Sequence, residues 1–317
     1  MNNASFEEKI WQMVTDTHMH DESELKNYNK LLYHYTTCAG LIGIIQTNKI
    51  WATSALFLND SQEIKYGINL TKSLLIEVQN ESINDIETYL VSNLLAEFDK
   101  YPRHNDMLNT YISCFSEQGD KLSQWKGFTE KGLGFSIGFD SSQFIYNYRS
   151  YPYVFITVKK VIYDPETQKN IIKNEIGKYI KIASDVGIDL LSDSDSSKDV
   201  ISCLSYSLFS FARIFKDEAF AEEREWRAIS TDLSKLKESK KLDLPVIRYR
   251  TDGNIIPYVE FDISPKHSNR KSIKMPINEI ICGPKIDFER NSLSIKKLLE
   301  DNDFYDVLIK PSNINLR

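Results

Sequence analysis

Short β-rich segments recur along this chain at irregular intervals, and their placement constrains the fold more than any other sequence feature. Amphipathic helical runs separate some of these segments but not others, so the chain lacks the regular alternation of a doubly wound parallel sheet. We therefore predict an α+β fold with a mixed, mostly antiparallel central sheet flanked by helices. The predicted strands span residues 31–36, 49–53, 110–116, 132–140, 153–163, 225–230, 244–249, 258–263, 279–283 and 306–309.

The helical runs define the expected domain organisation. Apolar residues recur at helical spacing within residues 1–14, which predicts an N-terminal helical extension over residues 1–30. A second helical stretch, around residues 164–217, interrupts the strands late in the chain. We expect residues 31–317 to form a single α+β domain that carries this stretch as a helical insertion.

Charge and composition exclude several classes of protein. The 39 basic and 45 acidic residues give a formal charge of −6, and no block of Lys and Arg is present to follow a nucleic-acid backbone, although a local basic site stays open. The four cysteines lie far apart without a CxxC pair, so we predict no structural metal. The N-terminus lacks a secretory signal, and no run approaches the roughly 18 apolar residues of a membrane span. We expect a cytoplasmic protein that does not engage a membrane.

The first group of candidate site residues lies on the predicted strand 31–36. On a strand, His34 and Thr36 share one face, whereas Tyr33 and Tyr35 point to the other. His34 either contacts a ligand or is a satisfied histidine that bonds a backbone carbonyl. The sequence leaves both interpretations open.

Two further groups have structural alternatives that are equally simple. Asn59 and Asp60 with Glu63 form a turn and a helix N-cap as readily as a ligand site. In the segment that contains Ser123 and Trp125, the serines have no partner histidine at a recognisable spacing, which argues against a serine nucleophile. Trp125 itself is more typical of a core anchor than of a site residue.

An acidic cluster at residues 222–227 is the sharpest feature. Strand alternation would place Glu223, Glu225 and Arg227 on one face and Trp226 on the other. On an exposed surface such charges form individually weak ion pairs. In a cleft, neighbouring carboxylates raise one another's pKa and suit acid–base chemistry or the stabilisation of a cation.

Six ordered motifs resemble the bacterial family known as domain of unknown function 2971, over about Leu31 to Lys285. The motifs are LLYHYTTCAGLIGIIQTNKIWAT, FLNDSQEIKYG, YISCFSEQGDKLSQW, GLGFSIGFD, FAEEREWR and INEIICGPK. The order of a histidine strand, a short helix, an aromatic segment and a late glutamate is similar, more distantly, to the ADP-ribosyltransferase superfamily. That resemblance implies a split central sheet and NAD as the substrate.

The resemblance also implies roles for individual residues. His34 would bind a ribose of NAD, Trp51 or Phe57 would stack on nicotinamide, and Arg227 would contact the pyrophosphate. Glu225, with Glu223 as the alternate, would be the catalytic carboxylate that stabilises the oxocarbenium-like transition state. The NAD-contacting candidates are His34, Tyr35, Thr36, Trp51, Phe57, Asn59, Ser116 and Arg227, and the remaining site candidates are Asp60, Glu63, Ser123 and Trp125.

Three functions follow as hypotheses. The first is an ADP-ribosyltransferase-like enzyme that cleaves NAD and modifies a nucleic-acid or protein target, as a toxin or anti-phage defence effector with a regulatory or antitoxin protein partner. It requires His34 and Glu225 to line one groove. The second is a metal-dependent nuclease in which Asp60, Glu63, Glu223 and Glu225 converge on magnesium. The third is a non-enzymatic nucleotide-sensing or interaction module.

Overall fold

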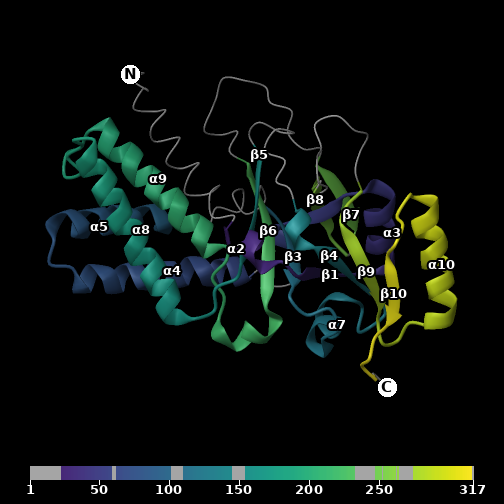
Figure 1. The fold of residues 1–317 in the computed structure, drawn as a ribbon. Helices are drawn as coiled ribbons and strands as arrows, with labels where there is room; N and C mark the ends of the chain where they lie inside the picture. The colour runs from purple at the N-terminus through teal and green to yellow at the C-terminus, as the bar shows by residue number, and fades with distance from the viewer. Residues whose placement is uncertain are drawn as a thin grey trace. The chain divides into compact units, whose positions relative to one another are not determined.

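The computed structural model describes residues 23–58, 62–100, 110–144, 154–232, 247–251, 253–261, 263 and 274–315 (Figure 1). The helix predicted within residues 1–14 lies outside this set. The chain divides into two compact units. The helical unit contains Leu58–Met107 and Val161–Ala221, and the sheet unit contains Ser23–Phe57, Leu108–Lys160 and Glu222–Arg317.

Helix caps mark where the helices of the helical unit begin. Its long helices are α4 (Gln62–Glu81), α5 (Asp85–Asp99), α8 (Pro165–Asp185) and α9 (Asp195–Ala212). The side chains of Asn84, Asp164 and Ser194 accept hydrogen bonds from backbone N–H groups in the first turns of α5, α8 and α9. Such caps satisfy donors that the helix leaves unpaired. The stretch predicted to be helical around residues 164–217 therefore consists mainly of α8 and α9.

The apolar faces of these helices pack against one another around α4, which contacts α5, α8 and α9. Phe98 of α5 stacks on Phe209 of α9 with ring centroids 4.0 Å apart. A side chain at Gly67 in α4 would meet the carbonyl oxygen of Ala212 at 1.9 Å. Glycine at this position is what permits the close approach of α4 to the end of α9.

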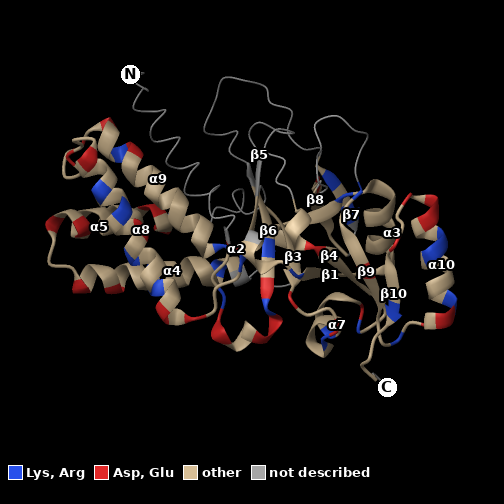
Figure 2. Cartoon of the chain, viewed as in Figure 1, with Lys and Arg blue, Asp and Glu red and all other residues tan. Residues whose placement is uncertain are grey.

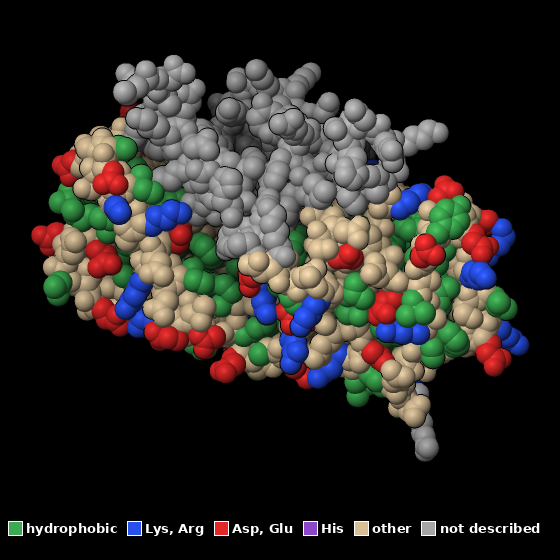
Figure 3. Space-filling view, viewed as in Figure 1, with side chains coloured by type: hydrophobic (Ala, Val, Ile, Leu, Met, Phe, Trp, Pro, Cys, Tyr) green, Lys and Arg blue, Asp and Glu red, His purple; other side chains and the backbone are tan. Residues whose placement is uncertain are grey.

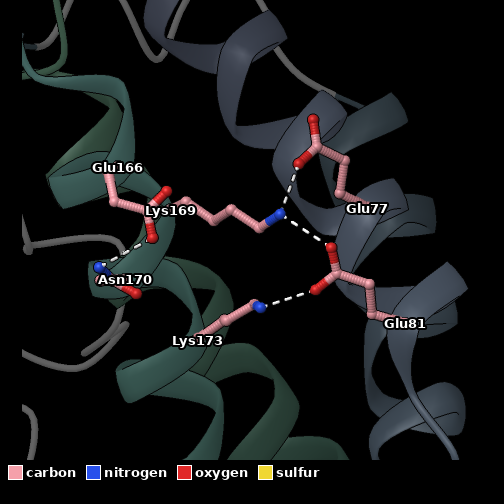
Figure 4. Close-up of polar contacts among 6 residues, drawn as sticks. All are labelled: Glu77, Glu81, Glu166, Lys169, Asn170 and Lys173. Atoms are coloured by element: carbon pink, nitrogen blue, oxygen red, sulfur yellow. Dashed lines mark hydrogen bonds and ion pairs between the residues drawn. The ribbon is translucent and has the colours of Figure 1, made fainter.

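An exposed ion-pair network joins α4 to α8 (Figure 4). Lys169 lies 2.9 Å from Glu77 and 2.8 Å from Glu81, and Lys173 lies 2.7 Å from Glu81. The hydrogen bonds from Lys169 and Lys173 lower the pKa of Glu81 to about 2. Because water and salt screen these charges, the network contributes little to stability.

The described residues of the sheet unit form ten strands in one hydrogen-bonded sheet, in the order β10-β9-β4-β1-β3-β2-β8-β7, with β6 attached to β3 and β5 attached to β6. All pairs are antiparallel except β9 with β10. The strands are β1 (Leu31–Thr36), β2 (Ile50–Ser54), β3 (Thr110–Ser116), β4 (Phe135–Asp140), β5 (Val154–Lys160), β6 (Glu225–Asp232), β7 (Arg248–Thr251), β8 (Ile255–Phe261), β9 (Ile277–Cys282) and β10 (Leu308–Pro311). The predicted α+β class with a mixed, mostly antiparallel sheet is confirmed.

The described strands form one connected sheet that branches at β3, and the split sheet that the resemblance implies stays a prediction. The irregularity is local to β3. Tyr33 of β1 pairs with Ser116, while Thr53 and Ser54 of β2 pair with residues near the start of β3. Both β1 and β2 therefore pair with the edge of β3 that faces away from β6. β1 pairs near the end of β3, and β2 pairs near its start.

The two faces of the sheet differ in chemistry. The apolar face carries Leu32, Phe115, Ile137, Trp226 and Ala228, which belong to one hydrophobic core. Residues from α2 (Ser23–Tyr28), α3 (Cys38–Thr47) and α10 (Phe288–Asp301) complete that core. The polar face carries Tyr33, Tyr35, Ser116, Glu225, Arg227 and Glu279 at the alternate strand positions.

Short helices and turns connect the strands. They are η1 (Ala55–Phe57), α7 (Leu122–Phe128), η2 (Ser141–Gln143) and η3 (Glu218–Glu223).

Among the described helices, none combines the length and the apolar character that crossing a membrane requires.

Candidate functional site

His34 lies on the apolar face of β1. Its Nδ1 lies 2.9 Å from the carbonyl oxygen of Cys114, so Nδ1–H donates to β3 and Nε2 is unprotonated in the neutral ring. The imidazole packs 5.8 Å from the ring of Phe115. Burial, opposed by the bond to Cys114 and aided by Arg250, lowers the pKa of His34. The histidine therefore acts as a neutral bridge between β1 and β3.

Glu225 and Arg227 form a buried ion pair at the start of β6. The Arg227 Nε and Nη2 donate to the two carboxylate oxygens of Glu225 at 2.8 and 3.0 Å. The side chain of Arg227 is 0% exposed and that of Glu225 is 8% exposed. The acidic and basic residues of β6 are adjacent in Figure 2. A two-point ion pair of this kind holds the carboxylate in a fixed orientation and occupies both of its oxygens.

Strand register separates His34 from Glu225. Tyr33 lies opposite Ser116, and Ser116 lies opposite Glu225. Directly opposed residues of antiparallel strands share a face, so Tyr33, Ser116 and Glu225 lie on the polar face. His34 follows Tyr33 and points to the other face. The register therefore puts the two side chains on opposite faces of the sheet, and their lining one groove stays a prediction.

Alternation had predicted that Glu223 shares the strand face of Glu225, and this prediction is wrong. It ends η3, and Arg224 then adopts a left-handed backbone conformation with φ of 45°, so β6 begins only at Glu225. The backbone carbonyl of Glu223 accepts a hydrogen bond of 2.7 Å from the hydroxyl of Ser116. Ser116 thus fixes the turn that leads into β6.

The aromatic candidates pack within the protein. Trp125 is fully buried, as the core-anchor alternative predicts, and its ring meets Tyr35 edge-on at 4.9 Å. Burial raises the pKa of Tyr35, and its hydroxyl donates to the carbonyl oxygen of Gln118 at 2.8 Å. Trp51 lies 4.9 Å from Tyr258. Phe57 is half-buried in η1.

The remaining candidates are dispersed. Thr36, at the end of β1, lies against Gly40 of α3. The Ser123 hydroxyl in α7 is buried without a hydrogen-bond partner among the described residues. Asn59, Asp60 and the side chain of Glu63 lie outside the described residues. Within the part of the chain that the structure describes, no cluster of His, Cys, Asp and Glu is arranged to hold a metal ion.

The structure brings together a second group that sequence reasoning missed, at the β2–β8–β7 end of the polar face. Thr53 lies opposite Tyr258, and Tyr258 lies opposite Arg248. Thr53 also lies opposite Ile112 of β3, which connects this row to the face that carries Arg227. We call this group the basic–aromatic end; it consists of Lys49, Trp51, Thr53, Arg248, Arg250, Tyr258 and Glu260.

The contacts within the basic–aromatic end leave much of its positive charge exposed. The single carboxylate, Glu260, lies 3.5 Å from Lys49 and 3.2 Å from Arg248. Arg250 donates to the hydroxyl of Thr53 at 3.1 Å. The side chains of Lys49 and Arg248 are 39% and 53% exposed, whereas that of Glu260 is 8% exposed. Two cations, Lys49 and Arg248, thus share one largely buried anion, and Arg250 bonds to a neutral hydroxyl.

Comparison with known proteins reaches only part of the chain. Residues 124–228 match the family described as Protein of unknown function (DUF2971). This stretch contains most of α7, β4, the helices α8 and α9, and the Glu225–Arg227 pair. The resemblance to that family is therefore supported over about the middle third of the chain. No curated protein and no solved structure matches the sequence.

Proposed function

We propose that the protein is a nucleotide-sensing module that binds an anionic nucleotide at the basic–aromatic end of its sheet. The observation that carries this proposal is the placement of three cations and two aromatic rings on one face of three adjacent strands. This site has a local formal charge of +2, in a chain whose formal charge is −6. This local charge supports the local basic site that composition left open.

The cations suit phosphate groups. Arg248 and Arg250 alternate along β7 and therefore point to the same face. A guanidinium group presents several fixed donors that match phosphate oxygens, and Lys49 adds a point charge. Acidic and basic side chains are interspersed over the surface visible in Figure 3. A ligand guided by this local charge would be small, rather than a long polyanion.

The aromatic rings suit a base or a nicotinamide. Trp51 and Tyr258 lie 4.9 Å apart at an interplanar angle of 35°, on β2 and on β8, and β8 pairs with the strand that carries the two arginines. Aromatic side chains contribute stacking area that is tolerant of base identity. Trp51, which the resemblance implied as a nicotinamide platform, thus keeps a binding role in this proposal without a catalytic partner.

Binding without catalysis fits the carboxylates better than NAD cleavage by the expected pair. Glu225 is ion-paired through both oxygens and lies across the sheet from His34. A glycosidic cleavage needs a carboxylate beside the reacting ribose. The polar face offers ligand contacts, but it does not bring the expected histidine and glutamate to one ligand.

Calorimetry tests the proposal with ATP, GTP, NAD, ADP-ribose and pyrophosphate as ligands. We expect at least one nucleotide to bind, and R248Q/R250Q to weaken it about 10- to 100-fold, the effect of losing a charge-assisted hydrogen bond or two. The control is R290Q/K297Q on α10, which removes two exposed cations elsewhere. Equal affinity of R248Q/R250Q and wild type, or no binding at all, contradicts the proposal.

The same samples separate sensing from catalysis. After incubation with NAD, chromatography should detect intact NAD and no nicotinamide. Nicotinamide release that is lost in E225Q would contradict a non-enzymatic module and would support the ADP-ribosyltransferase-like hypothesis.

A further inference from the structure

Asp120 is the meeting point of two parts of the sheet unit that are far apart in sequence. Its carboxylate accepts hydrogen bonds from the Ser312 hydroxyl at 2.6 Å, the Asn313 backbone N–H at 2.7 Å and the Trp125 indole at 2.7 Å. One side chain therefore holds the segment Ser312–Asn315, which we call the strap, and also orients the indole of α7.

The strap covers an aromatic cluster. Ile314 packs against the cluster of Tyr35, Trp125 and Ile281, to which Tyr33 also contributes. Sheet pairing ends just before this point, because β10 stops at Pro311 and the Ser312 N–H still donates to the Cys282 carbonyl at 2.9 Å. Beyond Ser312, the N–H groups of Asn313 and Ile314 donate to Asp120 and to the Ser312 hydroxyl.

The loop that carries Asp120 is held in place independently of the strap. Tyr35 donates to the carbonyl of Gln118 and accepts from the N–H of Lys121. A side chain at Gly119 would meet the ring of Tyr33 at 2.3 Å, so the loop lies directly on that ring. Asp120 is thus positioned whether or not the strap is docked.

Two polar atoms close to Asp120 in sequence are buried. The Gln118 Oε1 and the Ser123 Oγ, on either side of Asp120, have no partners among the described residues. Unpaired buried polar groups carry a desolvation cost. This cost lowers the stability of the segment around Asp120.

We propose that Ser312–Asn315 is a displaceable strap that closes over the Tyr35–Trp125 cluster, with Asp120 as its latch. When the strap opens, the sheet unit presents an aromatic surface beside an acceptor carboxylate. That surface fits a short peptide that presents, in this order, a hydroxyl, a backbone N–H and a branched aliphatic side chain. The strap presents the same three groups at Ser312, Asn313 and Ile314. The occupant is this chain's own strap.

Hydrogen exchange measured by mass spectrometry tests the latch. We expect D120N and S312A to speed exchange at residues 312–315 at least several-fold, while exchange in β9 stays unchanged. N315A, which alters an exposed strap residue, is the matched control and should leave the rate as in wild type. Strap exchange as slow as that of β9 and unaffected by both variants would show a permanently fixed segment and overturn the proposal.

A binding measurement tests displacement directly. A chain that ends at Pro311 is mixed with a labelled synthetic peptide of residues 312–317, and fluorescence polarisation is recorded. The peptide should bind the shortened chain, bind full-length protein far less, and fail to bind the shortened chain that carries D120N. Equal binding to both lengths, no binding to a folded shortened chain, or strap exchange between two copies in a dimer would each overturn the proposal.

Discussion

The two faces of the sheet are built from the same strands, yet they are stabilised in different ways. On the apolar face, Phe115, Ile137 and Trp226 are buried by packing, so their contribution scales with the volume that they fill. On the polar face, Glu225 and Arg227 are equally buried, but they are satisfied by each other. The comparison teaches that burial alone does not distinguish a core from a site, whereas the pairing of charges does.

Loss of one partner of the buried ion pair should have the largest effect on stability. R227M leaves the Glu225 carboxylate buried beside an uncharged side chain, and we expect a loss of about 3–5 kcal/mol in the free energy of unfolding. Urea denaturation measures it. The double variant E225M/R227M should be less destabilised than R227M, because both charges of the pair are removed together. A double variant as unstable as the single one would contradict the pairing argument.

A cavity on the apolar face should cost slightly less. Ile137 is fully buried and lies opposite His34. We expect I137A to lose about 2–5 kcal/mol of unfolding free energy and I137V about 0.5–1.5 kcal/mol, since the loss follows the volume removed. The same urea titrations report both values. Equal losses of unfolding free energy for I137A and I137V would contradict the argument that the apolar face is stabilised in proportion to the volume that its side chains fill.

The one imidazole described on the apolar face should make stability sensitive to acid. Burial lowers the pKa of His34 below 6.5, so below about pH 6.5 the unfolded chain binds a proton that the folded protein refuses. Stability should fall as pH drops toward the folded-state pKa and then level off. The His34 contribution to this slope is at most about 1.4 kcal/mol per pH unit.

H34Q removes this titration while keeping a donor for the Cys114 carbonyl. The wild-type and H34Q unfolding free energies, measured from pH 7.5 to 5, should therefore diverge only on the acid side. Parallel curves would show that His34 is not held neutral by the apolar face.

An exposed ion pair should show the smallest effect and sharpen the contrast with Glu225. E81Q weakens the network with Lys169 and Lys173 on the helical unit. We expect a small decrease in the melting temperature at low salt that disappears at 1 M NaCl, because the charges are screened by solvent ions. A large decrease that persists in high salt would show that this network is as important as the buried pair.

Local sequence patterns predicted the elements of the fold well. The strands over residues 31–36 and 110–116 have the bounds that were expected. Other strands begin or end a few residues away. Alternation along β1 was also correct, because His34 and Tyr33 point to opposite faces as the period of two requires.

The sequence could not predict the register between strands that are far apart along the chain. Whether His34 and Glu225 share a face depends on how β1 and β6 each align with β3, and a shift of one residue in either pair reverses the answer. The end of η3 at Glu223 depended likewise on the positive φ of Arg224, a residue type without special tolerance for it.

The basic–aromatic end was missed because its members are spread over three strands. Lys49 and Arg248 are separated by about two hundred positions and meet only through the pairing of β2, β8 and β7. One local signal was present. The alternation of arginine at Arg248 and Arg250 within a strand places two guanidinium groups on the same side.

The position of β3 also has a consequence for biosynthesis. It pairs with β1 and β2, which precede it by more than fifty residues, and with β6, which ends at Asp232. Such long sequence separations slow folding, because the chain loses entropy before the contacts are gained. More than a hundred residues separate β3 from β6, so β3 leaves the ribosome long before its partner strand is synthesised. During that interval the nascent sheet has an open edge for chaperones to protect.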